Sequence, residues 1–315
     1  MTKPGQIHCM LDCYAAIIER AGYDSRPLYS GVWEAGYDVG EHGIAYFGDE
    51  VDPKNWPERV NRLYNATIVY WCDYQAERSV NYDLLLRNLN AGRRNGAYLL
   101  TVDLYDFPHA PQFRSRHLPH IVIFEVGADG AWQIRDPYFS WEGSIARDTL
   151  EAGFLSGVWF DTAGMHDAIP AAAAELMRQD IHLGTNPLIV DIERLVREAL
   201  RRNDGYAPAT LFESIQQAGV ITKRFGGYLR VFGYLCDNEE ALDSMAADVA
   251  ALINAWEGFM FAIARLGLLK RAVDLPAISA KLARMRDMEA GIRERLLQAF
   301  SSWQFSARLE SNTRG

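Results

Sequence analysis

The hydrophobic pattern of the chain changes near residue 165, and this change constrains the fold more than any other feature. Before it, short apolar stretches with strand-like alternation are separated by Gly, Tyr and Trp. After it, apolar residues recur at helical spacing within segments rich in Ala, Leu, Arg and Glu. The expected strands are 66–71, 97–103, 120–126, 131–135 and 157–161, and the expected helices are 187–202, 208–217, 239–266 and 276–300. We therefore predict an α+β protein with domains at 1–165 and 166–315.

Composition and charge argue against several classes of protein. The 315 residues give room for two ordinary domains, and a net charge of −9 argues against nucleic acid as the main partner. No apolar run approaches the roughly 20 residues of a membrane span, so we expect no membrane segment. Four cysteines without a regular framework and a short polar start, 1–6, without the features of a signal peptide predict a cytoplasmic protein.

Negative charge is concentrated at the start of the chain. Residues 1–50 contain 3 Lys and Arg against 8 Asp and Glu, a net charge of −5. Such a field favours a cationic small molecule, although an acidic surface that only aids solubility is equally open. Carboxylates among aromatic rings suit a polyamine through charge pairing and cation–π contact, with a plain surface loop as the alternative. The candidate amine-binding residues are Glu34, Tyr37, Asp38 and Glu41.

The strongest chemical signal lies at the start of the chain. Small and apolar side chains after residue 14 predict a short, mostly buried helix, and Gly22 suits the left-handed position that ends it. Cys9 would then lie at the helix N-terminus, where backbone N–H groups and the helix dipole stabilise a thiolate. Cys13, one turn further on, is expected to be a packing thiol. The neighbouring His8 is expected at the surface.

A β-hairpin supplies the second part of the signal. The segments 118–126 and 131–136 read as two strands joined by a Gly-rich turn. His120 opens the first strand and Asp136 ends the second, and adjacent antiparallel strands can bring residues 16 apart together. A carboxylate there would fix the imidazole tautomer and stabilise the imidazolium. Taken singly these residues are ordinary, but with Cys9 they form a nucleophile, a base and an orienting group.

These segments resemble the papain-like cysteine peptidases that process bacteriocin leaders. Those enzymes carry a Cys at a helix start, a second Cys four residues on and a helix-ending Gly thirteen residues on. A strand-leading His and an Asp-Pro pair follow, about sixteen residues apart, and the later segment 151–160 resembles the closing strand region of that fold. The resemblance covers about residues 6–161. It implies a papain-like N-terminal domain with Cys9, His120 and Asp136 as its catalytic residues.

The layout of the whole chain is more similar to acyltransferases of the butirosin-biosynthesis type, which join a papain-like domain to a helical C-terminal half. It also resembles the type of enzyme that transfers 3,4-dihydroxybenzoate from a carrier protein to spermidine in petrobactin siderophore biosynthesis. This resemblance implies acyl transfer from the phosphopantetheine thioester of an acyl or aryl carrier protein, through a Cys9 acyl-enzyme, to an amine such as spermidine. The carrier protein would supply the phosphopantetheine, so the chain itself is expected to bind no cofactor. A papain-like peptidase or amidase and an inactive binding protein are the alternatives, and both a monomer and a homodimer are open.

One position departs from the papain-like pattern. Those enzymes place an oxyanion-hole Gln about six residues before the Cys, where this chain has Lys3. Gln6 is therefore the candidate oxyanion donor, with a backbone N–H at the helix start as the alternative. No metal site is expected, because Cys9 and Cys13 lack a second close pair of ligands.

Two basic segments are further candidates. The loop 105–118, just before His120, contains His109, Arg114, Arg116 and His117. It could gate the site or bind a phosphate through an arginine, or it could be a solvated loop. A second group at helical spacing could dock an acidic carrier protein or form a solvated helix face. Its members are Arg194, Arg197, Arg201 and Arg202.

Overall fold

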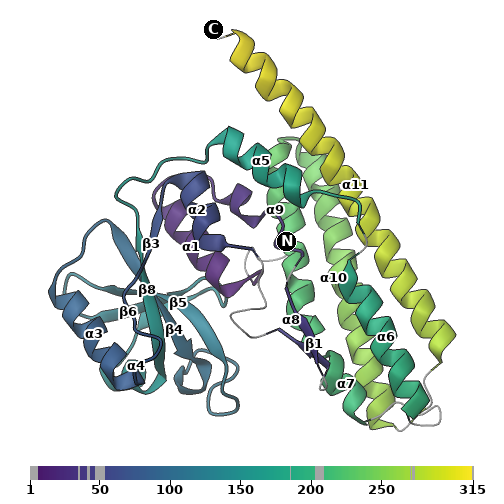
Figure 1. Ribbon diagram of the computed structural model, residues 1–315, viewed down its shortest axis with the longest axis horizontal. Helices are drawn as coiled ribbons and strands as arrows, with labels where there is room; N and C mark the ends of the chain where they lie inside the picture. The colour runs from purple at the N-terminus through teal and green to yellow at the C-terminus, as the bar shows by residue number, and fades with distance from the viewer. Residues whose placement is uncertain are drawn as a thin grey trace. The chain divides into compact units, whose positions relative to one another are not determined.

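The structure, a computed structural model, describes residues 6–34, 36–40, 43–46, 54–184, 186–202, 209–269, 271 and 274–313. The chain forms two compact units, both drawn in Figure 1. The sheet unit comprises Met1–Leu28 and Trp56–Ala172, and the helical unit comprises Tyr29–Asn55 and Ala173–Gly315. The described residues of the segment 29–55, which the sequence analysis assigned to the first domain, therefore group with the helices.

A six-stranded sheet in the order β3-β8-β4-β5-β6-β7 organises the sheet unit. Its strands are β3 (Thr67–Tyr70), β4 (Gly96–Asp103), β5 (Pro119–Val126), β6 (Trp132–Asp136), β7 (Trp141–Ser144) and β8 (Phe154–Asp161). Every neighbouring pair is antiparallel. Five of these strands follow from the alternating apolar pattern, whereas the short β7 was not expected. The hairpin β5–β6 is the one that carries His120 and Asp136.

Helices cover the sheet and bury its apolar side chains. They are α1 (Cys9–Arg20), α2 (Trp56–Tyr64), α3 (Arg78–Asn90) and α4 (Arg147–Gly153), with 3-10 turns η1 (Arg26–Tyr29) and η2 (Leu104–Asp106). Helix α1 packs against β5 and β4, whereas α3 packs against β8 and α4 against β4. Leu100, Phe124 and Ile134 are fully buried in the core beneath α3 and α4, and each such side chain stabilises the fold by roughly 1.5–3 kcal/mol. The sheet is therefore a rigid support for side chains at its strand ends.

The helical unit is a bundle built around two long helices. Its elements are α5 (Pro170–Asp180), α6 (Pro187–Arg202), α7 (Ala209–Ile215), α8 (Ala218–Thr222), η3 (Lys223–Phe225), α9 (Gly226–Leu235), α10 (Glu239–Leu268) and α11 (Leu275–Thr313), with the hairpin β1 (Asp38–Gly40) and β2 (Gly43–Ala45). Helix α10 packs against α7, α9 and α11. The helical period of the sequence predicted α6 at its observed bounds.

Two close contacts explain why the segment 29–55 joins the helices. Trp33 stacks on Tyr228 of α9, with ring centroids 4.4 Å apart and an interplanar angle of 17°. Gly31 has φ of +77°, and a Cβ there would lie 2.6 Å from the Asp180 carboxyl group. Only glycine fits both the backbone conformation and the space. These contacts join residues far apart in the chain.

Among the described residues, α10 is long and apolar enough to cross a membrane by length and composition. The sequence analysis did not single it out. Its buried side chains, including Val249, Leu252 and Trp256, pack in the bundle core, and core helices also meet this criterion. The absence of a membrane segment stays a prediction.

Candidate functional site

Cys9 is the first residue of α1, as predicted from the sequence. His8 is the N-cap residue, with φ −160° and ψ 119°. Its Nδ1 accepts hydrogen bonds from the backbone N–H groups of Met10 at 3.2 Å and Leu11 at 3.5 Å. His8 was expected at the surface; it is half-buried, and its imidazole satisfies N–H groups that the first turn leaves open, a capping role that was not predicted. The cap holds the Cys9 thiol at the positive end of the helix dipole.

Asp12 fixes the chain just before this helix. Its Oδ2 accepts hydrogen bonds from the backbone N–H groups of Ile7 at 3.0 Å and His8 at 3.2 Å. The Asp12 side chain is buried, so these bonds are shielded from water. The sequence analysis missed this residue, although an acidic residue in a first helical turn is a recognised capping signal. Asp12 thereby sets the backbone position from which Cys9 projects.

Cys13 differs from Cys9 in its surroundings. It is fully buried, and its Sγ lies 3.4 Å from the backbone oxygen of Ile121, to which the thiol donates. Burial raises the pKa of the Cys13 thiol well above its ordinary value, and the negative charge of Asp136 raises it further. A thiol that stays protonated is a poor nucleophile. These surroundings fit the packing role predicted for Cys13.

His120 and Asp136 meet in the buried part of the sheet unit. The Nε2 atom of His120 lies 3.1 Å from Oδ1 and 3.0 Å from Oδ2 of Asp136. The two side chains are 5% and 0% exposed. The ladder pairs Ile123 with Arg135, so His120 reaches Asp136 diagonally across the end of the hairpin. The backbone N–H of Phe139 also donates to Asp136 Oδ1, at 3.1 Å.

The charges of the pair support each other. Burial alone would lower the pKa of His120, but hydrogen bonds with Asp136 and Cys9 outweigh it and raise that pKa to about 10. Burial would raise the pKa of Asp136, but hydrogen bonds from His109 and His120 hold it below 3.8. Near neutral pH the pair is an imidazolium and a carboxylate. Since Nε2 of His120 faces Asp136, Nδ1 is the nitrogen left to face Cys9.

His109 is a functional candidate that the sequence analysis considered only as part of the loop 105–118, not as a partner of Asp136. Its Nε2 lies 3.0 Å from Oδ2 of Asp136, and its side chain is 4% exposed. The loop considered as a gate thus brings a second histidine to Asp136. The sequence offered little indication of this contact, because His109 lies in a segment without helical or strand periodicity, close to Phe107 and Ala110. Both neighbours are buried in the core.

The remaining site predictions have different outcomes. Gln6 is exposed with φ of 77°, three residues before Cys9, and its oxyanion role stays a prediction. Among the described residues no group of three His, Cys, Asp or Glu side chains could hold a metal ion.

The predicted amine-binding residues belong to the helical unit, whereas Cys9, His120 and Asp136 belong to the sheet unit. Glu34 Oε1 lies 2.7 Å from His182 Nε2 and 3.2 Å from Arg293 Nη1, so its charge is already compensated. The Tyr37 hydroxyl donates to Asp191 Oδ2 at 2.9 Å. Asp38 is exposed in β1, and Glu41 lies outside the described residues.

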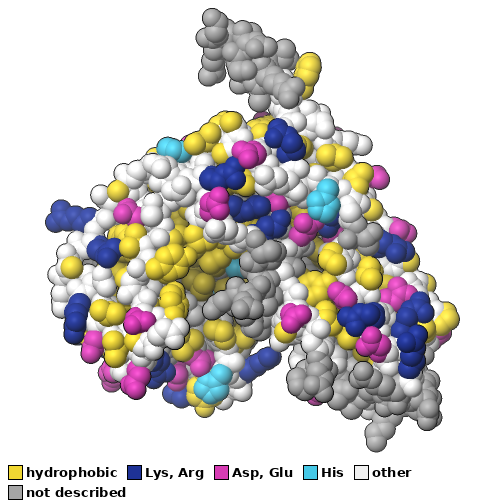
Figure 2. Space-filling model, in the orientation of Figure 1, with side chains coloured by type: hydrophobic (Ala, Val, Ile, Leu, Met, Phe, Trp, Pro, Cys, Tyr) yellow, Lys and Arg dark blue, Asp and Glu magenta, His cyan; other side chains and the backbone are white. Residues whose placement is uncertain are grey.

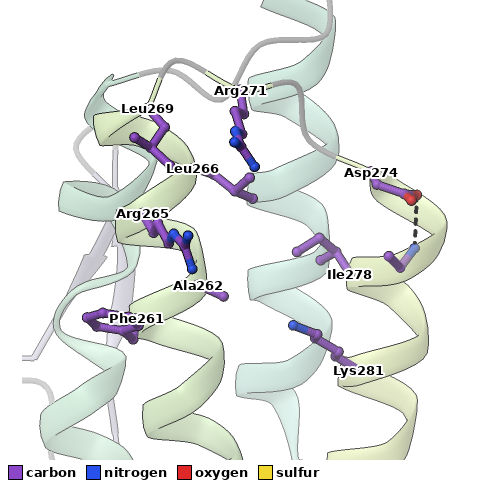
Figure 3. A pocket seen from close by; sticks show the side chains of 10 residues that line it. Phe261, Ala262, Arg265, Leu266, Leu269, Arg271, Asp274, Ile278 and Lys281 are labelled. Carbon is purple, nitrogen blue, oxygen red and sulfur yellow. Dashed lines mark hydrogen bonds between the residues drawn. The ribbon is translucent and has the colours of Figure 1, made fainter.

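A pocket of about 400 Å³ lies in the helical unit where α10 ends and α11 begins (Figure 3). Apolar side chains, among them Leu266 and Ile278, line it together with three cationic ones and one carboxylate, Asp274, whose Oδ1 accepts from the Ala277 backbone N–H at 3.1 Å. Figure 3 shows Arg265, Arg271 and Lys281 reaching toward the space from α10, the turn and α11. Within the described part of the chain, no carboxylate lies within ion-pair distance of these three cations. The pocket is therefore both apolar and basic.

Two arginines of α6, unlike those of the pocket, form ion pairs with carboxylates of the same helix. Arg194 pairs with Asp191 and with Glu198, both at 3.1 Å, and Arg197 pairs with Glu193 at 2.6 Å. Both arginines are exposed, so these pairs contribute only about 0.3–0.5 kcal/mol each. Their positive charge is largely offset on the helix itself. The side chain of Arg202 lies outside the described residues.

Apolar surface is also present on the sheet unit. Figure 2 shows hydrophobic side chains gathered over the region that Figure 1 labels β3 and β8. Tyr70 at the end of β3 and Tyr74 just beyond it are 59% and 61% exposed. Contiguous exposed apolar surface is typical of places where proteins bind ligands or partners.

Comparison with known proteins places the chain in a family. It is similar to petrobactin synthase from Bacillus anthracis, with 22% identity over 312 residues that cover 95% of each chain. Residues 5–164 match the DUF6005 N-terminal domain, and residues 172–314 match the DUF6005 C-terminal domain. The chain therefore belongs to the DUF6005 family.

Proposed function

We propose that this protein is an acyltransferase of siderophore or related secondary-metabolite biosynthesis, with a papain-like Cys9–His120–Asp136 triad in its sheet unit. The observation that carries the proposal is the buried pairing of His120 with Asp136 beside a thiol at a helix N-terminus. Similarity to petrobactin synthase supports a biosynthetic acyl-transfer reaction over peptide hydrolysis. The acyl donor is the phosphopantetheine thioester of a carrier protein, with 3,4-dihydroxybenzoyl as the first acyl group to test.

The first half-reaction moves the acyl group to Cys9. The Cys9 thiolate attacks the thioester carbonyl, and a new carbon–sulfur bond forms while the bond to the carrier sulfur breaks. The leaving carrier thiolate takes the proton from Nδ1 of the His120 imidazolium. Asp136 holds the ring in place and stabilises its charge before this transfer. Gln6 and the backbone N–H of Cys9 itself are the candidate donors to the oxyanion, since His8 already accepts from the N–H groups of Met10 and Leu11.

The second half-reaction forms an amide. Once Cys9 is acylated its negative charge is gone, so one of the two interactions that raise the pKa of His120 is lost. His120 is then a neutral base. The amine, already unprotonated after losing a proton to solvent, attacks the acyl-Cys9 carbonyl and gives a second proton to His120. The bond to Cys9 breaks, which restores the thiolate and the imidazolium.

We propose a polyamine such as spermidine as acceptor, since the first 50 residues carry a net charge of −5. Because Glu34 already forms ion pairs, it is a poor residue for testing amine binding. Replacing Glu34 with Gln should destabilise the helical unit, because Arg293 and His182 lose a charged partner. The exposed Asp38 is the better probe, and Asp38→Asn should raise KM for spermidine modestly. Equal rates with neutral amines of similar size at low salt would refute a cationic acceptor.

The basic, apolar pocket between α10 and α11 is our candidate dock for an acidic carrier protein. Within the described residues the three cations of this pocket have no ion-pair partner, whereas Arg194 and Arg197 of α6 are paired with carboxylates of their own helix. A double change of Arg265 and Lys281 to Glu should raise KM for a carrier-bound thioester and leave a small free thioester unaffected. Arg194→Glu is the matched control on α6. An unchanged KM for the carrier-bound substrate would reject this dock.

A product analysis tests the proposed reaction. The protein is incubated with an acyl thioester, with and without spermidine, and the products are separated by mass spectrometry. Amide that forms only with the amine supports transfer, whereas free acid alone would identify a peptidase or amidase. An inactive binding protein would give neither product, and its Cys9 would react with a thiol probe no faster than Cys72 or Cys236.

A further inference from the structure

Asp136 binds two imidazoles rather than one. Its Oδ2 lies 3.0 Å from Nε2 of His109 and 3.0 Å from Nε2 of His120. Its Oδ1 accepts from the Phe139 backbone N–H and lies 3.1 Å from the same His120 nitrogen. A triad needs only one carboxylate and one histidine, so the mechanism above leaves His109 unused.

The aromatic surroundings hold the ring of His109 in one orientation. It stacks on Trp141 with ring centroids 4.0 Å apart and an interplanar angle of 3°. Phe107 and Phe139 meet it edge-on, at 6.0 Å and 6.3 Å. The turn between β6 and β7 therefore supplies the carboxylate, the Phe139 amide and the stacking ring. A side chain fixed from three sides is suited to orienting a neighbour.

The hydrogen bonds to Asp136 determine which nitrogen of each imidazole carries a proton. A carboxylate only accepts, so each imidazole that bonds to it must carry a proton on the nitrogen that faces it. Both His109 and His120 are thus protonated on Nε2. A second imidazole donor on the same oxygen, Oδ2, also stops the carboxylate from turning away, because turning would leave the buried His109 N–H without an acceptor.

We propose that His109 is a positioning residue, which donates its Nε2–H to Asp136 and thereby holds the carboxylate in the orientation that aligns His120 with Cys9. This inference rests on the proposed triad and adds a fourth member to it. The titratable groups around Asp136 are His109 from the loop after η2, His120 from β5 and Cys13 from α1. The bond from His109 also helps to hold the pKa of Asp136 below its ordinary value.

Two substitutions separate the hydrogen bond from the stacking. His109→Phe keeps a ring against Trp141 and removes the donor, whereas His109→Gln keeps an N–H donor and removes the ring. The matched control is His117→Phe, because His117 pairs with Asp103 in the same loop but is 74% exposed. If His109→Phe fails to fold, His109→Asn replaces it, since its shorter amide cannot reach Asp136.

The first readout is the rate of Cys9 alkylation by iodoacetamide, followed by peptide mass mapping. We expect a fall of about tenfold in His109→Phe, as for a lost hydrogen bond to a charged group. The rate should stay within about threefold of the parent in His109→Gln and be unchanged in His117→Phe. With a small thioester, the acylation rate constant should fall in His109→Phe while KM stays constant.

The second readout is the ¹⁵N spectrum of the imidazoles, which reports the protonated nitrogen directly. We expect a proton on Nε2 of His109 in the parent protein. A proton on Nδ1 alone, or unchanged Cys9 alkylation in His109→Phe, would overturn the positioning role. Since alkylation needs no acyl donor, a fall in that rate supports the role of His109 even if the parent protein accepts no thioester. In that case the proposed function fails and the positioning inference stands.

Discussion

Replacing Asp136 with Asn removes one negative charge from the centre of the proposed triad and nearly preserves the shape of the side chain. In the parent protein two imidazoles and the Phe139 amide converge on the carboxylate. An amide offers one acceptor oxygen and one donor nitrogen, so at least one of these donors must face another donor. His120 therefore loses both the charge that stabilises its imidazolium and its fixed orientation.

The size of the effect follows from the pKa of His120. A rise from 6.5 to about 10 corresponds to a net of roughly 5 kcal/mol at about 1.36 kcal/mol per unit, which is what the interactions with Asp136 and Cys9 leave after burial has opposed them. The Asn substitution should remove on the order of 2 kcal/mol of this, which lowers the pKa of His120 by between about one and two units. Turnover should fall by ~10³–10⁴, because the imidazole tautomer and orientation are lost.

The assay is Cys9 alkylation measured against pH. The inflection at which His120 loses its proton should move from near pH 10 in the parent to roughly pH 8 to 9 in Asp136→Asn. Asp83→Asn, an exposed carboxylate of α3, is the matched control and should leave the profile unchanged. A profile and turnover in Asp136→Asn that match the parent would refute the pairing as the source of Cys9 reactivity.

The pKa shifts of His120 and Asp136 also predict how the free energy of unfolding varies with pH. The raised pKa of His120 gives stability that is complete below pH 6.5 and is lost as pH rises toward about 10. The lowered pKa of Asp136 gives stability that is complete above pH 3.8 and is lost as pH falls through its folded value. The difference in unfolding free energy between parent and Asp136→Asn should therefore be widest between pH 3.8 and 6.5. A difference that grows toward alkaline pH would contradict this sign.

Three further predictions concern single residues. Cys9→Ala should abolish the acyl-enzyme detected by intact-mass analysis, whereas Cys13→Ala should keep it. Cys13→Ala should lower the free energy of unfolding in urea by about 1 kcal/mol. Acyl groups found on Cys13 would refute the assignment. Asp12→Ala should cost about 2 kcal/mol and slow Cys9 alkylation, because two backbone N–H groups lose their acceptor. Arg293→Leu should cost about 3–5 kcal/mol in thermal unfolding, since buried Glu289 loses its charged partner at 3.0 Å, and an unchanged Tm would contradict this.

Local pattern was enough to predict much of the architecture. The five expected strands and the long helices are present because periodicity reports which face of an element is apolar. The hairpin and the meeting of His120 with Asp136 were predicted, but the exact register was not, because the ladder pairs Ile123 with Arg135 and leaves His120 diagonal to Asp136. The helix start at Cys9 was predicted from the small and apolar residues that follow it.

Contacts between distant parts of the chain could not be predicted from local pattern. The segment 29–55 joins the helical unit through contacts such as Trp33 with Tyr228, which no local period encodes. His109 reaches Asp136 from a loop whose conformation depends on buried Phe107 and Ala110. The cap by His8 was missed because imidazole is an uncommon capping group. In each case the sequence identified a residue type, and the tertiary fold decided its partner.

A pulse-chase mass measurement tests the central claim most directly. The protein is mixed with a dihydroxybenzoyl thioester, digested and mapped, and a second sample is chased with spermidine before digestion. The account predicts a dihydroxybenzoyl adduct on Cys9 alone, which disappears in the chase as dihydroxybenzoyl-spermidine forms in equal amount. An adduct on another residue, or amide formed at the parent rate by Cys9→Ala, would contradict the account.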